Sequence, residues 1–132
     1  MATGGGRFDG KIKLWNIYSG ASLKTVETGS QISSLLWSEE FKEIVSSHSG
    51  PLNELNIWKS SDMSKVNSLI GHSSRVLSMV LSPDRETVLT AGADETLRIW
   101  KCFGLSERQK RQKLSKISDR IDSALCSSKF IR

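Results

Sequence analysis

Short runs of alternating apolar and polar residues recur along the chain, and three of them end in tryptophan. The runs are Ile12 to Trp15, Leu55 to Trp58 and Leu97 to Trp100, so the tryptophans lie 43 and 42 residues apart. Alternation of this kind is typical of strands with one buried face. The regular spacing predicts a multistranded unit that is repeated along the chain.

A second pair of similar segments falls in register with the first. Residues 31–38 lie 44 residues before residues 75–82, and their apolar residues occupy matching positions. We predict that both segments are the first, innermost strand of a repeated antiparallel unit. Between them, the same alternation predicts strands over 43–47, 54–59 and 65–69.

The stretch from Gly71 to Trp100 resembles a WD repeat, the unit that forms one blade of a β-propeller. It begins with a Gly-His pair, continues with an alternating run and a Ser-Pro-Asp turn at 82–84, and ends with an Asp-containing turn before the tryptophan strand. The repeat length of about 40 to 45 residues agrees. The expected fold class is therefore all-β, a partial WD-repeat β-propeller of about two and a half blades, followed by a basic C-terminal tail.

In a WD repeat, a tryptophan N–H, a hydroxyl, an imidazole and a turn carboxylate form a buried relay of hydrogen bonds. The candidates for this structural relay are Trp100, Thr90, His72 and Asp94. Such a relay satisfies polar groups that are buried between strands. A His-Asp pair also occurs in catalytic triads, but no Ser or Cys here lies in a nucleophile motif such as Gly-x-Ser-x-Gly. We therefore expect no catalytic residue and no enzyme.

The repeat divides the chain into four parts. Residues 1–28 are expected to form the second half of a blade, 29–71 a complete blade, 72–103 three strands of the last blade and 104–132 the tail. A closed propeller needs about four blades or more, so we expect the chain to be the C-terminal part of something larger. Whether it is a fragment or a natural short product stays open. Unpaired strand edges predict poor solubility or self-association of the isolated chain.

Positive charge is concentrated in the tail. The net charge is +5, and residues 104–132 contain eight Lys or Arg against three Asp or Glu, whereas the rest of the chain is balanced. Leu114, Ile117, Ile121 and Leu125 follow a helical spacing, so the tail is either an amphipathic helix or a largely disordered basic segment. It lacks the interleaved aromatic residues that stack on bases. We therefore rank a partner-binding segment above nucleic-acid binding.

The two cysteines, Cys102 and Cys126, are too few for a disulfide framework, and no Cys or His pair has the spacing of metal ligands. We expect no metal and no cofactor. The sequence contains neither a signal pattern nor an apolar run long enough to cross a bilayer. A reducing compartment is the expectation, which means the cytoplasm and nucleus, with no membrane partner.

Several segments, taken in order, resemble the fizzy family, the cell-division-cycle type of WD-repeat coactivators of the anaphase-promoting complex. They cover nearly the whole chain and comprise residues 2–6, 30–32, 71–77, 81–84 and 93–100, together with the terminal Ile131-Arg132. Two segments depart from the family pattern, namely residues 49–56 and the turn Arg7-Phe8-Asp9-Gly10. The first blade of the family, which completes its groove for one class of degradation motif, is not among these residues.

Propeller geometry places three polar side chains on one face. In an up-and-down blade, the loop before the first strand and the loop between the second and third strands emerge on the same side. Gln31 and Arg75 precede first strands, and Glu95 lies in a loop of the second kind. An amide, a cation and a carboxylate on one face suit the recognition of polar peptide side chains.

The resemblance implies what this face binds. The family recognises degradation motifs (degrons) of substrates in the ubiquitin pathway of mitosis. Gln31 and Arg75 would contact a Lys-Glu-Asn box, and Glu95 would pair with the Arg of a destruction box. Ile131 and Arg132 would dock to tetratricopeptide subunits of the ligase. The implied partners are thus the ligase, degron-containing substrates and checkpoint proteins. The alternatives are a generic WD scaffold or a truncated product without substrate recognition and, ranked lower, a nucleic-acid-associated protein.

Overall fold

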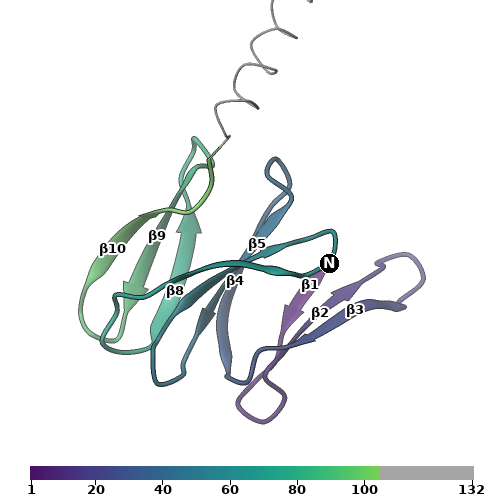
Figure 1. Cartoon of the computed structure of the whole chain (residues 1–132), viewed down its shortest axis with the longest axis horizontal. Coiled ribbons are helices and arrows are strands. Elements are labelled where there is room, and N and C mark those ends of the chain that lie inside the picture. The colour runs from purple at the N-terminus through teal and green to yellow at the C-terminus, as the bar shows by residue number, and fades with distance from the viewer. Residues whose placement is uncertain (105–132) are drawn as a thin grey trace, which may run out of the picture.

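The computed structural model describes residues 1–104, which form three antiparallel β-sheets arranged as a fan (Figure 1). The first sheet contains β1 (Ala2–Gly4), β2 (Lys11–Trp15) and β3 (Ser22–Glu27). The second contains β4 (Ile32–Ser38), β5 (Glu43–His48), β6 (Leu55–Lys59) and β7 (Lys65–Leu69). The third contains β8 (Val76–Leu81), β9 (Thr87–Gly92) and β10 (Leu97–Lys101). Within each sheet, strands that are consecutive in the sequence are neighbours.

This arrangement confirms the all-β partial propeller expected from the sequence. The four strands predicted between residues 31 and 69 are present, and their ends differ from the prediction by one residue at most. The three tryptophans lie at or next to the end of β2, β6 and β10. The predicted tail helix, with its disordered alternative, lies outside the described residues.

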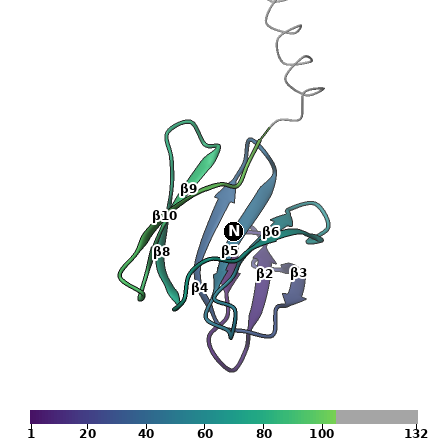
Figure 2. The ribbon, with the colours of Figure 1, turned by 60° about the vertical axis from the view of Figure 1, so that its left-hand side comes forward.

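Two apolar clusters fill the spaces between neighbouring sheets. The cluster between the first and second sheets contains Ile12, Leu14, Ile32, Ile44, Trp58 and Met63. The cluster between the second and third sheets contains Val45, Leu55, Ile57, Val76, Met79, Val88 and Phe103. The second sheet, which lies between the other two (Figure 2), contributes to both clusters. Successive residues of a strand point to opposite faces, which explains why Ile44 and Val45 are both fully buried.

The first strands of the second and third sheets, β4 and β8, lie against each other. Each pairs with the following strand through a register shift near its beginning, between Ile32 and Ser34 in β4 and between Val76 and Ser78 in β8. The same bulge therefore occurs at the same place in two repeats. It gives the segments just before β4 and β8 equivalent positions.

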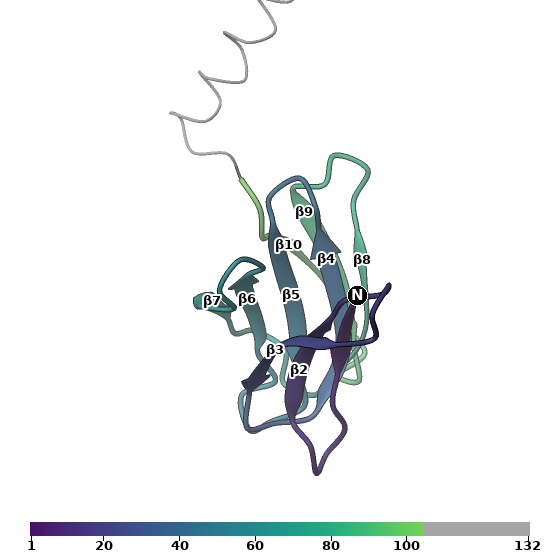
Figure 3. The ribbon, with the colours of Figure 1, turned by 90° about the vertical axis from the view of Figure 1, so that its right-hand side faces the viewer.

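The second and third sheets differ at their outer edges. In the second sheet, β7 pairs with β6 and forms the edge (Figure 3). In the third sheet, β10 pairs with β9 and has no further strand beside it within residues 1–104. Val80, Leu89 and Ile99 are paired with one another across the three strands of this sheet. Their exposed fractions of 56%, 37% and 76% show that no neighbouring sheet in the described part covers that face.

Candidate functional site

The third sheet contains the hydrogen bonds of the relay expected from the sequence. Trp100 Nε1–H donates to Thr90 Oγ1 at 2.8 Å, and Thr90 Oγ1 lies 2.7 Å from His72 Nε2. His72 Nδ1 lies 2.9 Å from Asp94 Oδ2. An ionised carboxylate can only accept, so His72 Nδ1 carries the proton of this hydrogen bond. The buried polar groups of the relay are thereby satisfied.

Asp94 is held by several donors besides the imidazole. Its carboxylate accepts hydrogen bonds from the Thr96 hydroxyl at 2.7 Å, the Thr96 N–H at 3.1 Å and the Ser73 N–H at 3.0 Å. These donors, and the Thr96 hydroxyl most of all, lower the pKa of Asp94 well below its usual value. A carboxylate with a lowered pKa is a weak base, and several donors already occupy its oxygens, so Asp94 suits an anchor for the β9–β10 turn.

The second sheet contains a relay of the same kind that was not recognised from the sequence. Trp58 Nε1–H donates to Ser46 Oγ at 2.7 Å, and Ser46 Oγ lies 2.7 Å from His48 Nε2. His48 Nδ1 lies 2.8 Å from Ser30 Oγ. A serine hydroxyl therefore occupies the end of the relay where the third sheet has a carboxylate. The signal in the sequence was a hydroxyl and an imidazole two residues apart, which places Ser46 and His48 on the same side of β5.

The two relays obtain their imidazole from different positions in the repeat. His48 pairs with the first residue of β4, and the residue that pairs with the first residue of β8 is Gly92. A Cβ atom at Gly92 would lie 2.5 Å from His72 Nδ1. In the third sheet the imidazole thus enters from the segment before β8, and a glycine on β9 leaves the space for it.

The first sheet retains one step of the pattern. Trp15 Nε1–H donates to Thr3 Oγ1 at 2.8 Å, as the other two tryptophans donate to a hydroxyl. Asp9 occupies the sequence position that corresponds to Asp94, but its carboxylate lies 3.8 Å from Lys13 Nζ in an ion pair. The relays therefore position the loops at one end of the fan, and their regularity decreases toward the N-terminus.

Gln31 and Arg75 occupy equivalent positions at that end of their sheets. Ser49 N–H donates to the Gln31 carbonyl at 3.0 Å, and Ala93 N–H donates to the Arg75 carbonyl at 2.9 Å. In both sheets the residue before the first strand is thus fixed to the residue that follows the second strand. The Gln31 side chain is half-buried and Arg75 is exposed.

Gln31 and Arg75 line a common cavity of about 430 Å³. The other lining residues are Arg7, Gly29, Ser30, Ser49, Gly50 and Pro51. The lining combines two guanidinium groups, one amide and two serines with no carboxylate. Guanidinium groups bind carboxylates and phosphates through paired hydrogen bonds, so this cavity suits a peptide with polar and acidic side chains.

Glu95 does not line this cavity. It lies in the β9–β10 turn, where its φ of 61° is in the left-handed region, and its side chain is exposed. The corresponding loop of the second sheet contributes Gly50 and Pro51 to the wall beside Arg75. By the same geometry, the β9–β10 turn would face the first strand of a following blade, and residues 1–104 contain no such strand.

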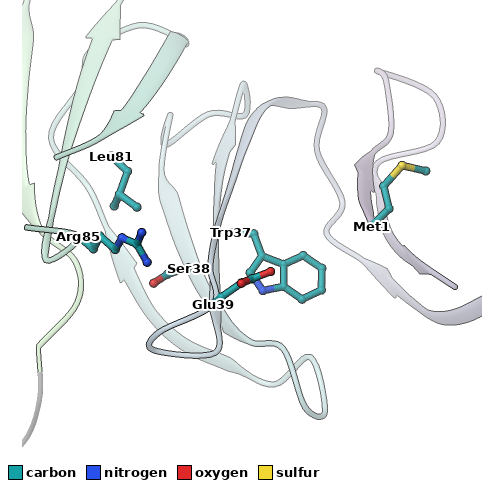
Figure 4. A pocket seen from close by; sticks show the side chains of 6 residues that line it. All are labelled: Met1, Trp37, Ser38, Glu39, Leu81 and Arg85. Atoms are coloured by element: carbon teal, nitrogen blue, oxygen red, sulfur yellow. The ribbon is translucent and has the colours of Figure 1, made fainter. Parts of the chain in front are cut away.

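A second cavity, of about 550 Å³, lies where β4 and β8 end (Figure 4). It is lined by Met1, Trp37, Ser38, Glu39, Leu81 and Arg85. Leu81 and Arg85 lie on one side, Met1 on the other, and the Trp37 indole lies between them (Figure 4). Its lining carries both charges, Arg85 and Glu39, beside apolar side chains, so it suits no single class of ionic ligand.

Ile131 and Arg132, the expected docking residues, lie outside the described residues. Within residues 1–104, no group of three His, Cys, Asp or Glu side chains is placed to hold a metal ion. No helix in that range is long and apolar enough to span a membrane.

Comparison with protein families matches residues 63–101 to the family described as WD domain, G-beta repeat. Cell division cycle 20.5, cofactor of APC complex, from Arabidopsis thaliana is 52% identical over 116 residues, which are 88% of this chain and 26% of that protein. Anaphase-promoting complex subunit cdc20 from Dictyostelium discoideum is 50% identical over 78% of this chain and 21% of that protein. The chain thus spans about a quarter of the length of such relatives.

A solved structure of a mitotic checkpoint complex contains a chain of similar fold. The TM-score is 0.73 with 45% sequence identity, and the match covers 78% of this chain and 33% of that one. The arrangement of the three sheets therefore agrees with an experimentally determined relative.

Proposed function

The chain belongs by sequence to the fizzy family of WD-repeat proteins, and from this premise we propose that it is a non-catalytic adaptor of the anaphase-promoting complex, a ubiquitin ligase. In this role it binds degron peptides on the face that contains Gln31 and Arg75. Relatives at about half identity are named as a cofactor or subunit of that complex, which supports the ligase as the partner. The similar chain in a mitotic checkpoint complex supports checkpoint proteins as further partners.

The observation that carries the proposal is the cavity that Gln31 and Arg75 share. An amide and a guanidinium that face one space can bind the polar side chains of a Lys-Glu-Asn box, with Arg75 on its acidic group. Glu95 binds the Arg of a destruction box at the open edge of the third sheet. An exposed ion pair contributes little by itself, so this second interaction is expected to be the weaker one in the chain alone.

The test is peptide binding measured by fluorescence anisotropy. Arg75→Ala should weaken binding of a Lys-Glu-Asn peptide about tenfold and leave a destruction-box peptide unaffected, whereas Glu95→Ala should weaken only the destruction-box peptide. Arg85→Ala is the matched control, because Arg85 lines the cavity at the other end of the strands. Unchanged affinities of both peptides in the Arg75 and Glu95 variants would contradict the proposal.

Docking to the ligase is a separate part of the proposal. We expect Ile131 to enter an apolar pocket and the Arg132 guanidinium to pair with carboxylates of a tetratricopeptide subunit. Deletion of these two residues should abolish co-precipitation of the tetratricopeptide subunits with the chain. An unaffected precipitation would refute this part and leave the peptide-binding face untouched.

A further inference from the structure

We propose that Arg7 makes the cavity at Gln31 and Arg75 a binding site for a phosphorylated side chain, carried by the same peptide as the Lys-Glu-Asn box. The inference rests on the proposed function for the box and adds to it a phosphorylated class of substrate. Arg7 belongs to the turn between β1 and β2, one of the two segments that depart from the family pattern, and it lines the cavity together with Arg75.

The turn that carries Arg7 is fixed against the second sheet. Ile32 N–H donates to the Gly5 carbonyl at 3.1 Å, and the Thr28 hydroxyl donates to the Gly10 carbonyl at 2.8 Å. Gly10 has a φ of 51°, and a Cβ atom there would lie 3.3 Å from the backbone N and O of Ser30. Contacts on both sides of Arg7 thus hold the backbone of the turn beside Ser30, so the backbone needs little ordering when a ligand binds, and the exposed Arg7 side chain is the part that the ligand orders.

The two guanidinium groups reach the cavity from different sheets. Arg7 comes from the first sheet and Arg75 from the segment before the third, while Ser30 and Gln31 belong to the segment that enters the second sheet between them. Neither arginine side chain has an ion pair or hydrogen bond to another residue within 1–104, and Asp9, the acidic residue of the same turn, is paired with Lys13. Both cations are therefore available to a ligand.

The charge of the ligand follows from this arrangement. One carboxylate satisfies one guanidinium, and a site with two of them and no carboxylate in its lining favours a doubly charged group. A phosphoserine carries a charge of about −1.5 to −2 at neutral pH and offers three acceptor oxygens. A peptide with a single acidic residue leaves one arginine without a partner, so phosphorylation is expected to select among peptides that carry the box.

The experiment uses the full chain and a set of Lys-Glu-Asn peptides with one phosphoserine at successive positions on either side of the box. At one or two neighbouring positions, phosphorylation should strengthen binding about tenfold at low salt. Glutamate at the same position should give a smaller gain, since it carries one charge. The readout is the ratio of the affinities of the phosphorylated and unphosphorylated peptides. Arg7→Gln should bring this ratio close to one, whereas Arg85→Gln should leave it as in the unmodified chain. Circular dichroism of the variants checks that the fold is retained.

The outcomes test the phosphate site at Arg7 separately from the binding of the Lys-Glu-Asn box. A gain at no position, or a gain that persists in Arg7→Gln, would overturn the inference even if the unphosphorylated box binds. Binding of phosphopeptides alone, with dependence on Arg7, would support the phosphate site and contradict the box. Inorganic phosphate that competes with the phosphopeptide at equal concentration would show a site for the free anion and would overturn the claim of a peptide site.

Discussion

The second and third sheets contain nearly the same third strand, yet its side chains lie in opposite environments. In β6, Leu55 and Ile57 are 1% and 3% exposed, whereas the equivalent residues of β10, Leu97 and Ile99, are 71% and 76% exposed. The residue types are identical, so propensity and alternation cannot account for the difference. The second sheet has a neighbour on each face, and the third sheet has a neighbour on one face within residues 1–104. Burial in a repeat protein is thus a property of the stack rather than of the repeat.

The relays of the same two sheets differ in how they are built. The relay of the second sheet consists of hydroxyl groups and His48, and that of the third sheet ends on the charged Asp94. Both satisfy a tryptophan N–H and both fix the loop that precedes the first strand. The repeat therefore requires a closed path of hydrogen bonds and tolerates different residues along it.

The largest expected effect is a difference in stability between variants of β6 and β10, the third strands of the second and third sheets. Ile57→Ala should lower the free energy of unfolding by about 3 kcal/mol, because it leaves a cavity in the cluster between the second and third sheets. Ile99→Ala should lower it by less than about 0.5 kcal/mol, because the side chain is already exposed. Urea denaturation followed by tryptophan fluorescence measures both values.

Equal losses in the two variants would contradict the comparison. They would show that the outer face of the third sheet is covered in solution, as self-association of the chain would cause. Repeating the titration over a range of protein concentrations distinguishes this case, because stabilisation by association depends on concentration.

A smaller effect is expected from the relay hydroxyls. Ser46→Ala removes a partner from Trp58 Nε1 and His48 Nε2, and Thr90→Val removes the same partner from Trp100 and His72. Each should cost about 2 kcal/mol, because buried polar groups are left without a hydrogen bond. Thermal unfolding of both variants, with the exposed Ser22→Ala as control, provides the measurement. A neutral Thr90→Val beside a costly Ser46→Ala would show that the two relays are not equivalent in energy.

Much of the fold could be predicted from the sequence, because strands with one buried face leave an alternating pattern and repeats place it at a fixed spacing. The equivalence of Gln31 and Arg75 followed from the same spacing, since a topology of antiparallel strands determines which loops share an end. The relay of Trp100, Thr90, His72 and Asp94 could also be predicted, because its residues stand at the positions usual for the repeat.

Three features were not recognised from the sequence, for physical reasons. His48 replaces an imidazole that normally comes from another segment, so its role depends on a space that exists only after β4 and β5 pair. Arg7 reaches the cavity because contacts with Ser30 and Ile32 fix its turn, and the local pattern does not specify contacts between sheets. The exposure of Leu97 and Ile99 was likewise not evident from residues that match Leu55 and Ile57.

The two relays should also differ in their response to acid. Burial lowers the pKa of His48 below its usual value of 6.5. Two smaller contributions act in opposite directions, since Glu54 raises this pKa and Lys65 lowers it. Above pH 6.5 His48 is neutral in both states. Below it, the unfolded chain takes up a proton that the folded chain does not, so the unfolding free energy falls. Asp94 also has a lowered pKa, but its usual value is 3.8, so its stabilisation is lost only in more acidic solution.

The smallest expected effect is therefore a decrease in the free energy of unfolding between pH 7 and pH 5 that is caused by His48 in the second sheet. His48→Gln, which retains a hydrogen-bonding side chain, should flatten the dependence of the unfolding free energy on pH in this window, whatever its effect at pH 7. Asp94→Asn should alter the slope below about pH 4, where the carboxylate of the unmodified chain takes up its proton. Burial raises the pKa of Glu43, which opposes this loss of stability. The contribution of Glu43 is common to the unmodified chain and both variants, so it cancels when their slopes are compared.

Urea titrations at half-unit pH intervals measure the slopes. An unaltered slope in His48→Gln would mean that His48 is not kept neutral by burial, and that its relay responds to acid as that of the third sheet does.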